Sequence, residues 1–77
     1  MAPLEVTSEP LSIVVNGDPR DVPSGFTVAS LLASLDLNPR LVVVERNREI
    51  LRDRDAFEHV ELATGDTIEI VHFVGGG

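Results

Sequence analysis

The sequence predicts a two-layer α+β domain, in which a mixed sheet of four or five strands carries one helix on one face. Strand-like segments, either alternating or β-branched, occur on both sides of a single segment with helical periodicity. The first two strand-like segments are joined by Asn16-Gly17, the dipeptide most typical of a tight hairpin. One helix covers only one face of a sheet, so we expect the other face to be solvated or to meet a partner.

The first two predicted strands form this hairpin. Leu11–Val15 is expected to be the first strand, and Arg20–Val22 the strand that returns from the turn. Pro19 and Pro23 flank the second strand and place it at an edge of the sheet, because proline cannot donate to a strand ladder.

Residues 26–35 are predicted to form the helix. Apolar residues follow the i, i+3, i+4, i+7 pattern of one helical face, at positions 28, 31, 32 and 35. Thr27 is a good N-cap, and Phe26 and Leu31 take the positions of a hydrophobic staple. Asn38-Pro39 is expected to end the helix.

The second half of the chain predicts three more strand segments. Leu41–Arg46 is a β-branched run typical of a buried strand, and Arg48–Leu51 is expected to pair with it after a turn. Residues 52–57 are charged and predict a loop or one helical turn. The last strand is expected to span Thr67–Val74 and to run directly into three glycines.

The composition excludes several classes of function. The 77 residues suffice for one domain, with 43% hydrophobic and 25% charged residues. The absence of cysteine excludes disulfides, thiolate metal sites and a cysteine nucleophile, and two histidines argue against a structural zinc site. The net charge of −7 disfavours nucleic acid and anionic membrane surfaces as partners.

The chain is expected to contain one domain between two tails. Residues 1–10 hold two prolines and little periodicity, which predicts a disordered N-terminal extension. The domain would span residues 11–74, and residues 75–77 would form a flexible tail. No apolar run approaches the roughly 20 residues of a membrane span, and the start lacks a signal core. We therefore expect a cytoplasmic protein that is monomeric when free.

The glycine tail, Gly75, Gly76 and Gly77, is the most informative feature of the sequence. It follows an apolar strand without a polar spacer, unlike a typical added linker. A backbone without side chains can enter a narrow cleft that any Cβ would obstruct. A carboxylate is a poor electrophile and must first be activated, most simply as a mixed anhydride with AMP, before a sulfur or nitrogen nucleophile can react. The tail thus predicts a protein whose own terminal carboxylate is the substrate.

Two segments carry a resemblance to a known family: residues 43–50, VVERNREI, and residues 68–77, IEIVHFVGGG. Together with the hairpin, the helix and the terminal diglycine, they resemble the ubiquitin-like β-grasp fold. Within that fold, they resemble the ThiS sulfur carriers of bacterial thiamine thiazole biosynthesis. The resemblance covers about residues 11–77, and residues 1–10 depart from the family pattern.

The resemblance implies a carrier protein rather than an enzyme. An E1-like adenylating enzyme would use ATP to convert the Gly77 carboxylate to an acyl-adenylate. Sulfur from a cysteine desulfurase or related donor would then replace AMP, giving a thiocarboxylate. Thiazole synthase would accept that sulfur, and the carrier itself would bind no cofactor. Gly76 and Gly77 match the family's site, with Gly75 as a flexible lead-in.

The alternation of the last strand predicts a docking surface beside the tail. Ile68 and Ile70 are expected to face the helix, which leaves Val71 and Phe73 on the open face. Val14 of the first strand can join them. These side chains either lie under loops or form an apolar surface shared by successive partners.

Other polar residues carry less information. Arg46 and acidic residues are expected at the rim of the docking surface, where they could orient a partner. His72 lies near the tail, but a lone strand histidine without an inferable carboxylate partner indicates a structural residue. Arg52–Asp55 is interpreted as a solvated loop and Thr64–Asp66 as a turn. No phosphate loop, nucleophile elbow or metal-ligand spacing is present.

Three alternatives stay open from the sequence. The small subunit of molybdopterin synthase, or another β-grasp sulfur carrier, would share the chemistry but serve another acceptor; Val71–Val74 lacks the prolines that often precede that subunit's diglycine. A ubiquitin-like modifier would form an isopeptide bond, and an interaction domain would have an inert tail. All six basic residues are arginine, and we expect the absence of lysine to reduce self-acylation by an activated terminus.

Overall fold

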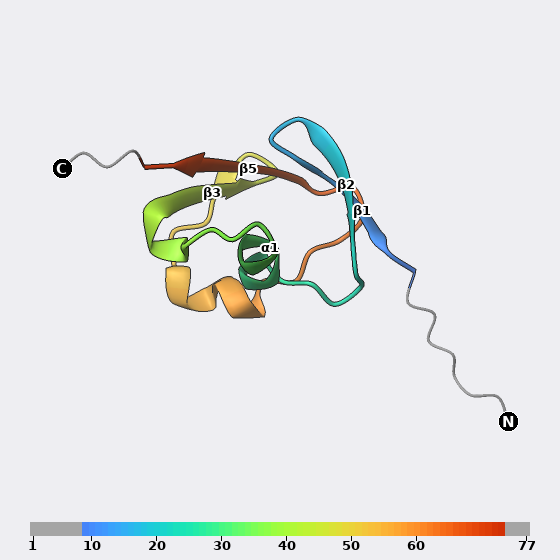
Figure 1. The fold of residues 1–77 in the computed structure, drawn as a ribbon, viewed down its shortest axis with the longest axis horizontal. Coiled ribbons are helices and arrows are strands. Elements are labelled where there is room, and N and C mark those ends of the chain that lie inside the picture. Colours follow the sequence, from blue (N-terminus) through green and yellow to red (C-terminus); the bar gives the residue numbers. More distant parts are fainter. Residues whose placement is uncertain (1–8, 74–77) are drawn as a thin grey trace, which may run out of the picture.

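The computed structural model describes residues 9–73, which form one sheet and one helical layer (Figure 1). The elements are β1 (Leu11–Val15), β2 (Asp18–Val22), α1 (Val28–Ser34), the 3₁₀ helix η1 (Pro39–Leu41), β3 (Val42–Arg46), β4 (Glu49–Ile50), the 3₁₀ helix η2 (Arg54–His59) and β5 (Thr67–His72). The strand order is β2-β1-β5-β3-β4; β1 and β5 are parallel, and the other neighbours are antiparallel. The predicted α+β class and the mixed sheet, with five strands, are confirmed.

The core lies between the sheet and the helical layer, which Figure 1 shows on one side of the strands. Buried apolar side chains from every strand except β4, from α1, from η2 and from the segment before β5 fill it: Ile13, Val15, Val22, Val28, Leu31, Leu32, Val42, Val44, Phe57, Leu62, Ile68 and Ile70. Within residues 9–73, no helix covers the opposite face of the sheet. No helix in this described part is long and apolar enough to cross a membrane.

The β1–β2 hairpin forms as predicted, with a longer second strand. Asn16 and Gly17 have φ values of 50° and 86°, the two positive angles of a type I′ turn. The second strand begins at Asp18 and therefore contains Pro19, which the sequence had placed outside it. In a two-residue hairpin the Val15–Asp18 pair is hydrogen-bonded, so the Pro19 nitrogen points away from β1 and costs no ladder bond. The predicted edge position of this strand is confirmed.

The helix is shorter than the sequence predicted. Thr27 caps it as expected, because its hydroxyl accepts a hydrogen bond from the Ser30 N–H at 3.1 Å. The helix ends before Asn38-Pro39, because Asp36 adopts a left-handed φ of 64° and turns the chain out. The N–H groups of Asp36 and Leu37 then bond the last free carbonyls of α1, as in a Schellman motif.

The charged segment after β4 takes the second of the two predicted forms, a helical turn. It forms η2, and the Arg54 guanidinium donates to the carbonyls of Pro39 at 3.0 Å and Val42 at 3.1 Å. Arg54 therefore ties η2 to the start of β3. Residues 52–55 are exposed, in agreement with the interpretation of this segment as solvated, but the Arg54 side chain is held by these two hydrogen bonds.

A buried carboxylate joins the start of β5 to the end of β3. Asp66 is only 6% exposed and accepts hydrogen bonds from the Arg46 guanidinium at 2.9 and 3.0 Å, the Asn47 amide at 3.0 Å and the Ala63 N–H at 2.9 Å. Burial alone would raise the pKa of Asp66. The hydrogen bonds from Asn47, Ala63 and Arg46, together with the positive charge of Arg46, outweigh burial and lower this pKa.

This ion pair corrects the expected position of Arg46. Its side chain is committed to Asp66, and by strand alternation it lies on the same face of β3 as the buried Val42 and Val44. Arg46 is therefore not at the rim of the open face. Asp66, interpreted from sequence as a turn residue, is its partner.

We predict that Asp66→Asn lowers the free energy of unfolding at neutral pH by about 1–3 kcal/mol, because Arg46 loses its charged partner. The folded-state pKa of Asp66 lies below its ordinary value of 3.8. The carboxylate therefore stabilises the fold fully above that value, and this contribution is lost as the pH falls through the folded-state pKa. Urea unfolding at a series of pH values should show a flatter acid limb in Asp66→Asn.

The exposed Asp18→Asn is the matched control and should follow the wild-type curve. An Asp66→Asn protein with wild-type stability at neutral pH would contradict this account of the network.

Candidate functional site

The predicted reactive residue Gly77 and its lead-in, Gly75 and Gly76, lie outside the described residues, as does Val74. The structure describes the strand that leads to them. β5 ends at His72, and Phe73 is the last described residue. Figure 1 shows β5 pointing away from the end of the molecule where β1 begins.

The open face of β5 carries the two apolar side chains that the sequence placed there. Ile68 and Ile70 are buried in the core, whereas Val71 is 61% exposed and Phe73 is 45% exposed. The prediction that Val71 and Phe73 face away from the helix is confirmed. The strand thus presents two large apolar groups immediately before the tail.

Strand β3 and the last residue of η1 add apolar neighbours that the sequence did not reveal. The register places Val43 opposite Val71. The Phe73 N–H donates to the Leu41 carbonyl at 2.8 Å, so Leu41 lies opposite Phe73. All four residues belong to the same side of the sheet by strand alternation.

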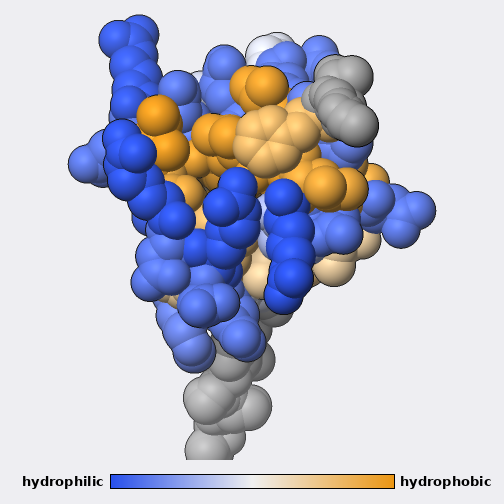
Figure 2. All heavy atoms as spheres, turned by 90° about the vertical axis from the view of Figure 1, so that its left-hand side faces the viewer, coloured by the Kyte–Doolittle hydropathy of each residue, from blue (hydrophilic) through white to orange (hydrophobic). Residues whose placement is uncertain are grey.

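Ile50 on β4 extends this row, because it is paired with Glu45, the next open-face residue of β3. Leu41 and Ile50 are 45% and 44% exposed. We call the five residues the apolar surface: Leu41, Val43, Ile50, Val71 and Phe73. Figure 2 shows hydrophobic side chains gathered at this end of the molecule and bordered by hydrophilic ones.

Val14 lies apart from the apolar surface. Its register partner on β5 is Thr67, so Glu69 lies between Val14 and Val71 along the open face. Four residues along a strand correspond to about 13 Å. The expectation that Val14 joins Val71 and Phe73 is therefore corrected: Val14 is half-buried on the same face but at its other end.

Two glutamates border the apolar surface. Glu45 of β3 is paired directly with Glu69 of β5. Like charges directly opposite each other destabilise a sheet. Within residues 9–73, the one ion pair within 4.0 Å joins Arg46 and Asp66, so neither glutamate has a salt-bridge partner in this part of the chain. The open face therefore has an acidic border that reduces the stability of the free protein.

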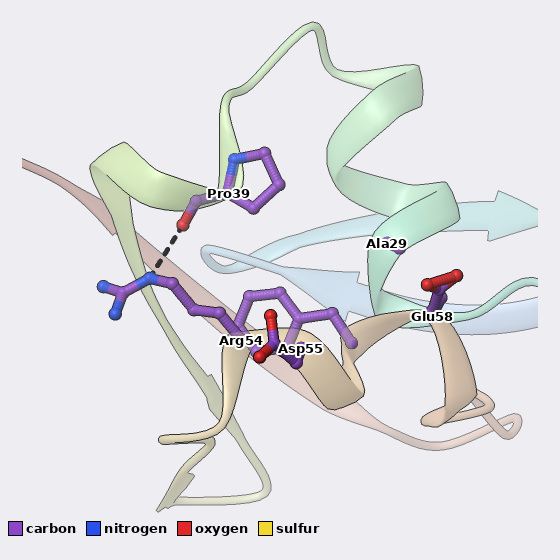
Figure 3. A pocket seen from close by; sticks show the side chains of 6 residues that line it. Ala29, Pro39, Arg54, Asp55 and Glu58 are labelled. Carbon is purple, nitrogen blue, oxygen red and sulfur yellow. Dashed lines mark hydrogen bonds between the residues drawn. The ribbon is translucent and has the colours of Figure 1, made fainter.

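The hollow between α1, η1 and η2 lies on the helical side of the molecule. It has a volume of about 500 Å³ and is lined by Ala29, Pro39, Arg54, Asp55, Phe57 and Glu58 (Figure 3). Its arginine is bonded to the Pro39 carbonyl, as the dashed line in Figure 3 marks. Among the described residues, no group of three or more histidine, aspartate or glutamate side chains is arranged to hold a metal ion.

The histidines remain without an assigned role. His72 and His59 are both exposed, and neither side chain makes a hydrogen bond or ion pair within residues 9–73. The site therefore consists of the end of β5, the apolar surface around it and the glutamate pair beside it.

The chain is similar to proteins of one family. The ThiS family model matches residues 13–77. The sulfur carrier protein ThiS of Bacillus subtilis (strain 168) is 53% identical over 51 residues, which are 66% of this chain and 76% of that protein. A crystal structure of the thiamine biosynthesis protein ThiS from Geobacter metallireducens matches with a TM-score of 0.73 and 36% identity, over 87% of this chain and 100% of that chain.

A thiazole synthase of Paramagnetospirillum magneticum is also similar. It is 40% identical over 67 residues, which are 87% of this chain but only 20% of that protein. This chain therefore spans about a fifth of the thiazole synthase that it matches. The β-grasp arrangement, the family match through the terminal glycines and the structural similarity lead to one conclusion: the chain belongs to the ThiS family.

Proposed function

We propose that this protein is a sulfur carrier in thiamine biosynthesis and that its working group is the carboxyl of Gly77. The observation that carries the proposal is the family match over residues 13–77, which includes the terminal glycines. The protein is then the substrate of its partners and catalyses no reaction itself. It acts in the cytoplasm and binds no cofactor.

The chemistry follows from the low reactivity of a carboxylate. The Gly77 carboxylate attacks the α-phosphorus of ATP on an E1-like enzyme, which releases pyrophosphate and forms an acyl-adenylate. A persulfide from a donor such as a cysteine desulfurase displaces AMP from the carbonyl carbon and forms an acyl disulfide. A thiol reductant then cleaves this disulfide and releases the thiocarboxylate. The resulting thiocarboxylate donates its sulfur on thiazole synthase. A thiazole synthase that contains a segment similar to this chain supports a close relation between the two functions.

The described structure supports this role through the position of the apolar surface. Phe73 lies four residues before Gly77, so a partner bound to the apolar surface holds the tail close to its own active site. Exposed apolar side chains grouped in this way are typical of protein interaction sites. The acidic border suits a partner that places arginine or lysine against Glu45 and Glu69.

We predict that the carrier exchanges one terminal oxygen for sulfur. Purified protein incubated with the adenylating enzyme of the same organism, ATP, a cysteine desulfurase, cysteine and a thiol reductant should show this exchange by intact-mass spectrometry. Deletion of Gly76 and Gly77 should abolish it. Gly76→Ala should slow adenylation by about 10-fold or more, because one Cβ displaces the reacting carboxylate in a narrow cleft.

Ser24→Ala, an exposed change in the loop before α1, is the control and should react like the wild type. An unchanged wild-type mass with every component present would contradict the proposal. Stable attachment to lysines of other proteins would instead support a ubiquitin-like modifier.

We predict that Val71→Thr raises the KM of the carrier for the adenylating enzyme by about 3- to 10-fold, because a hydroxyl is brought into an apolar interface. Val14→Thr is the matched control, since it is the same change on the same sheet face outside the apolar surface. It should leave the KM within about twofold of wild type. Phe73→Ala should fold normally and show the larger rise in KM. Equal KM values for the wild type and Phe73→Ala would exclude the apolar surface as the docking site.

We predict that Glu69→Gln has opposite effects on stability and on docking. Removing the like charge opposite Glu45 should raise the melting temperature of the free protein by about 1–5 °C. The same change should weaken the complex with the adenylating enzyme, most strongly at low salt. Glu61→Gln, an exposed glutamate outside this border, should change neither quantity. A stabilised Glu69→Gln protein with wild-type affinity would show that the glutamate pair has no part in docking.

A further inference from the structure

The pairing of β5 with β1 continues beyond the end of β1. The Asn16 N–H donates to the Ile68 carbonyl at 2.9 Å, and this is the last bond that the β1 backbone makes to β5. The next groups of β5 on this side are the N–H and C=O of Ile70, because alternate residues of a strand bond the same neighbour. By this point the chain has already turned into the β1–β2 hairpin.

The side chain of Asn16 takes the place of the missing strand. Its Oδ1 accepts from the Ile70 N–H at 2.7 Å, and its Nδ2 donates to the Ile70 carbonyl at 3.2 Å. The side-chain amide therefore supplies the same donor and acceptor as a peptide group. The positive φ of Asn16 is a requirement of the turn, which glycine or aspartate also meets. The two bonds to Ile70 additionally require a side chain with both a donor and an acceptor, which the amide of Asn16 has and which glycine and aspartate lack.

Ile70 is the last residue of β5 that is held on this side. Within residues 9–73, no hydrogen bond joins β5 to the hairpin beyond Ile70. On the other side, the Phe73 N–H is still bonded to Leu41 of η1. Without the Asn16 amide, the end of β5 would be attached along one edge alone. A two-stranded ribbon twists more freely than a three-stranded sheet, so the end of β5 would then vary in its direction relative to the rest of the sheet.

We propose that Asn16 is a positioning residue for the chemistry at the tail. Its side chain sets the direction in which β5 leaves the sheet, and therefore where the tail lies relative to the apolar surface. This inference rests on the proposed carrier function. A partner that binds the apolar surface and the tail together binds only those molecules whose strand end points the right way. The apparent affinity falls in proportion to that fraction.

This role predicts a specific kinetic signature. Loss of the two hydrogen bonds between the Asn16 side chain and Ile70 lowers the fraction of carrier molecules that are ready to bind, which raises KM. Once the tail lies in the cleft of the partner, the cleft determines its geometry, so kcat stays the same. A general loss of stability would not separate the two constants in this way.

Asn47 provides a matched control at the other end of β5. It also lies in a hairpin turn, with a φ of 51°, and its Oδ1 accepts from the Thr67 N–H at 2.8 Å while its own N–H donates to the Thr67 carbonyl at 2.8 Å. Asn47 also donates to the buried Asp66. Asn47→Gly should therefore destabilise the fold at least as much as Asn16→Gly, without touching the end of β5 that leads to the tail.

The test compares Asn16→Gly with Asn47→Gly, since glycine preserves both turns and removes only the side-chain bonds. The rate of adenylation by the partner enzyme is measured from the release of pyrophosphate. Amide hydrogen exchange is measured by NMR on the free protein. Asn16→Gly should raise KM by about 3- to 10-fold with kcat within twofold of wild type. Its Ile70 amide should exchange about 10-fold faster or more. Asn47→Gly should lower the melting temperature but keep the wild-type KM and the wild-type exchange of Ile70.

An Asn16→Gly protein with wild-type KM, or with kcat lowered instead of KM raised, would overturn the proposal. An equal rise of KM in Asn47→Gly would overturn it too, because the effect would then follow stability. The exchange measurement needs no partner. If the wild type is never adenylated, the proposed function fails. Unchanged exchange of the Ile70 amide in Asn16→Gly would separately show that the Asn16 side chain does not hold the end of β5.

Discussion

The pairing of β5 on both of its edges is the constraint on which the rest of the molecule depends. β5 lies between β1 and β3: its pairing with β3 covers Ile68 to His72, whereas β1 pairs with it only at Thr67 and Ile68. Its start is held by the Asp66–Arg46 ion pair and by Asn47, and its later part by Asn16. Each of these contacts joins β5 to a hairpin distant in sequence. The strand that leads to the glycine tail is therefore held on both edges by contacts with distant parts of the chain.

The open face reflects a conflict between stability and interaction. A free protein would gain stability from a polar residue in place of exposed Val71 and from an opposite charge in place of Glu45 or Glu69. The sheet instead keeps an apolar surface next to two facing carboxylates. Residues that lower the stability of the free state while lying beside the proposed reactive end are most simply explained by a bound state in which they find partners. The core on the other face of the sheet shows no such compromise, because its buried side chains among residues 9–73 are all apolar apart from the fully hydrogen-bonded Asp66.

Local signals in the sequence were sufficient for much of this architecture. The Asn16-Gly17 turn, the Thr27 cap and the alternation of β5 are each encoded within a few residues, and each was confirmed. Contacts between segments that are distant in the sequence could not be predicted from it. The run from Leu41 to Val44 is apolar at every position, so it has no period that separates the buried Val42 from Val43 on the open face. The register that isolates Val14, and the ion pair that occupies Arg46, likewise depend on which strands become neighbours. The glycines proposed to react are identified from the sequence alone, since the described structure stops at Phe73.

The two outer strands have a consequence for how the protein behaves at high concentration. One margin of the sheet is β2, where Pro19 removes an outward N–H and Asp18, Arg20 and Asp21 add charge; the other margin is β4, which is only two residues long. Both features hinder the edge-to-edge stacking by which sheets grow into aggregates. The protein can thus expose the apolar surface that we propose for docking while its strand edges stay protected from pairing with other copies of the chain.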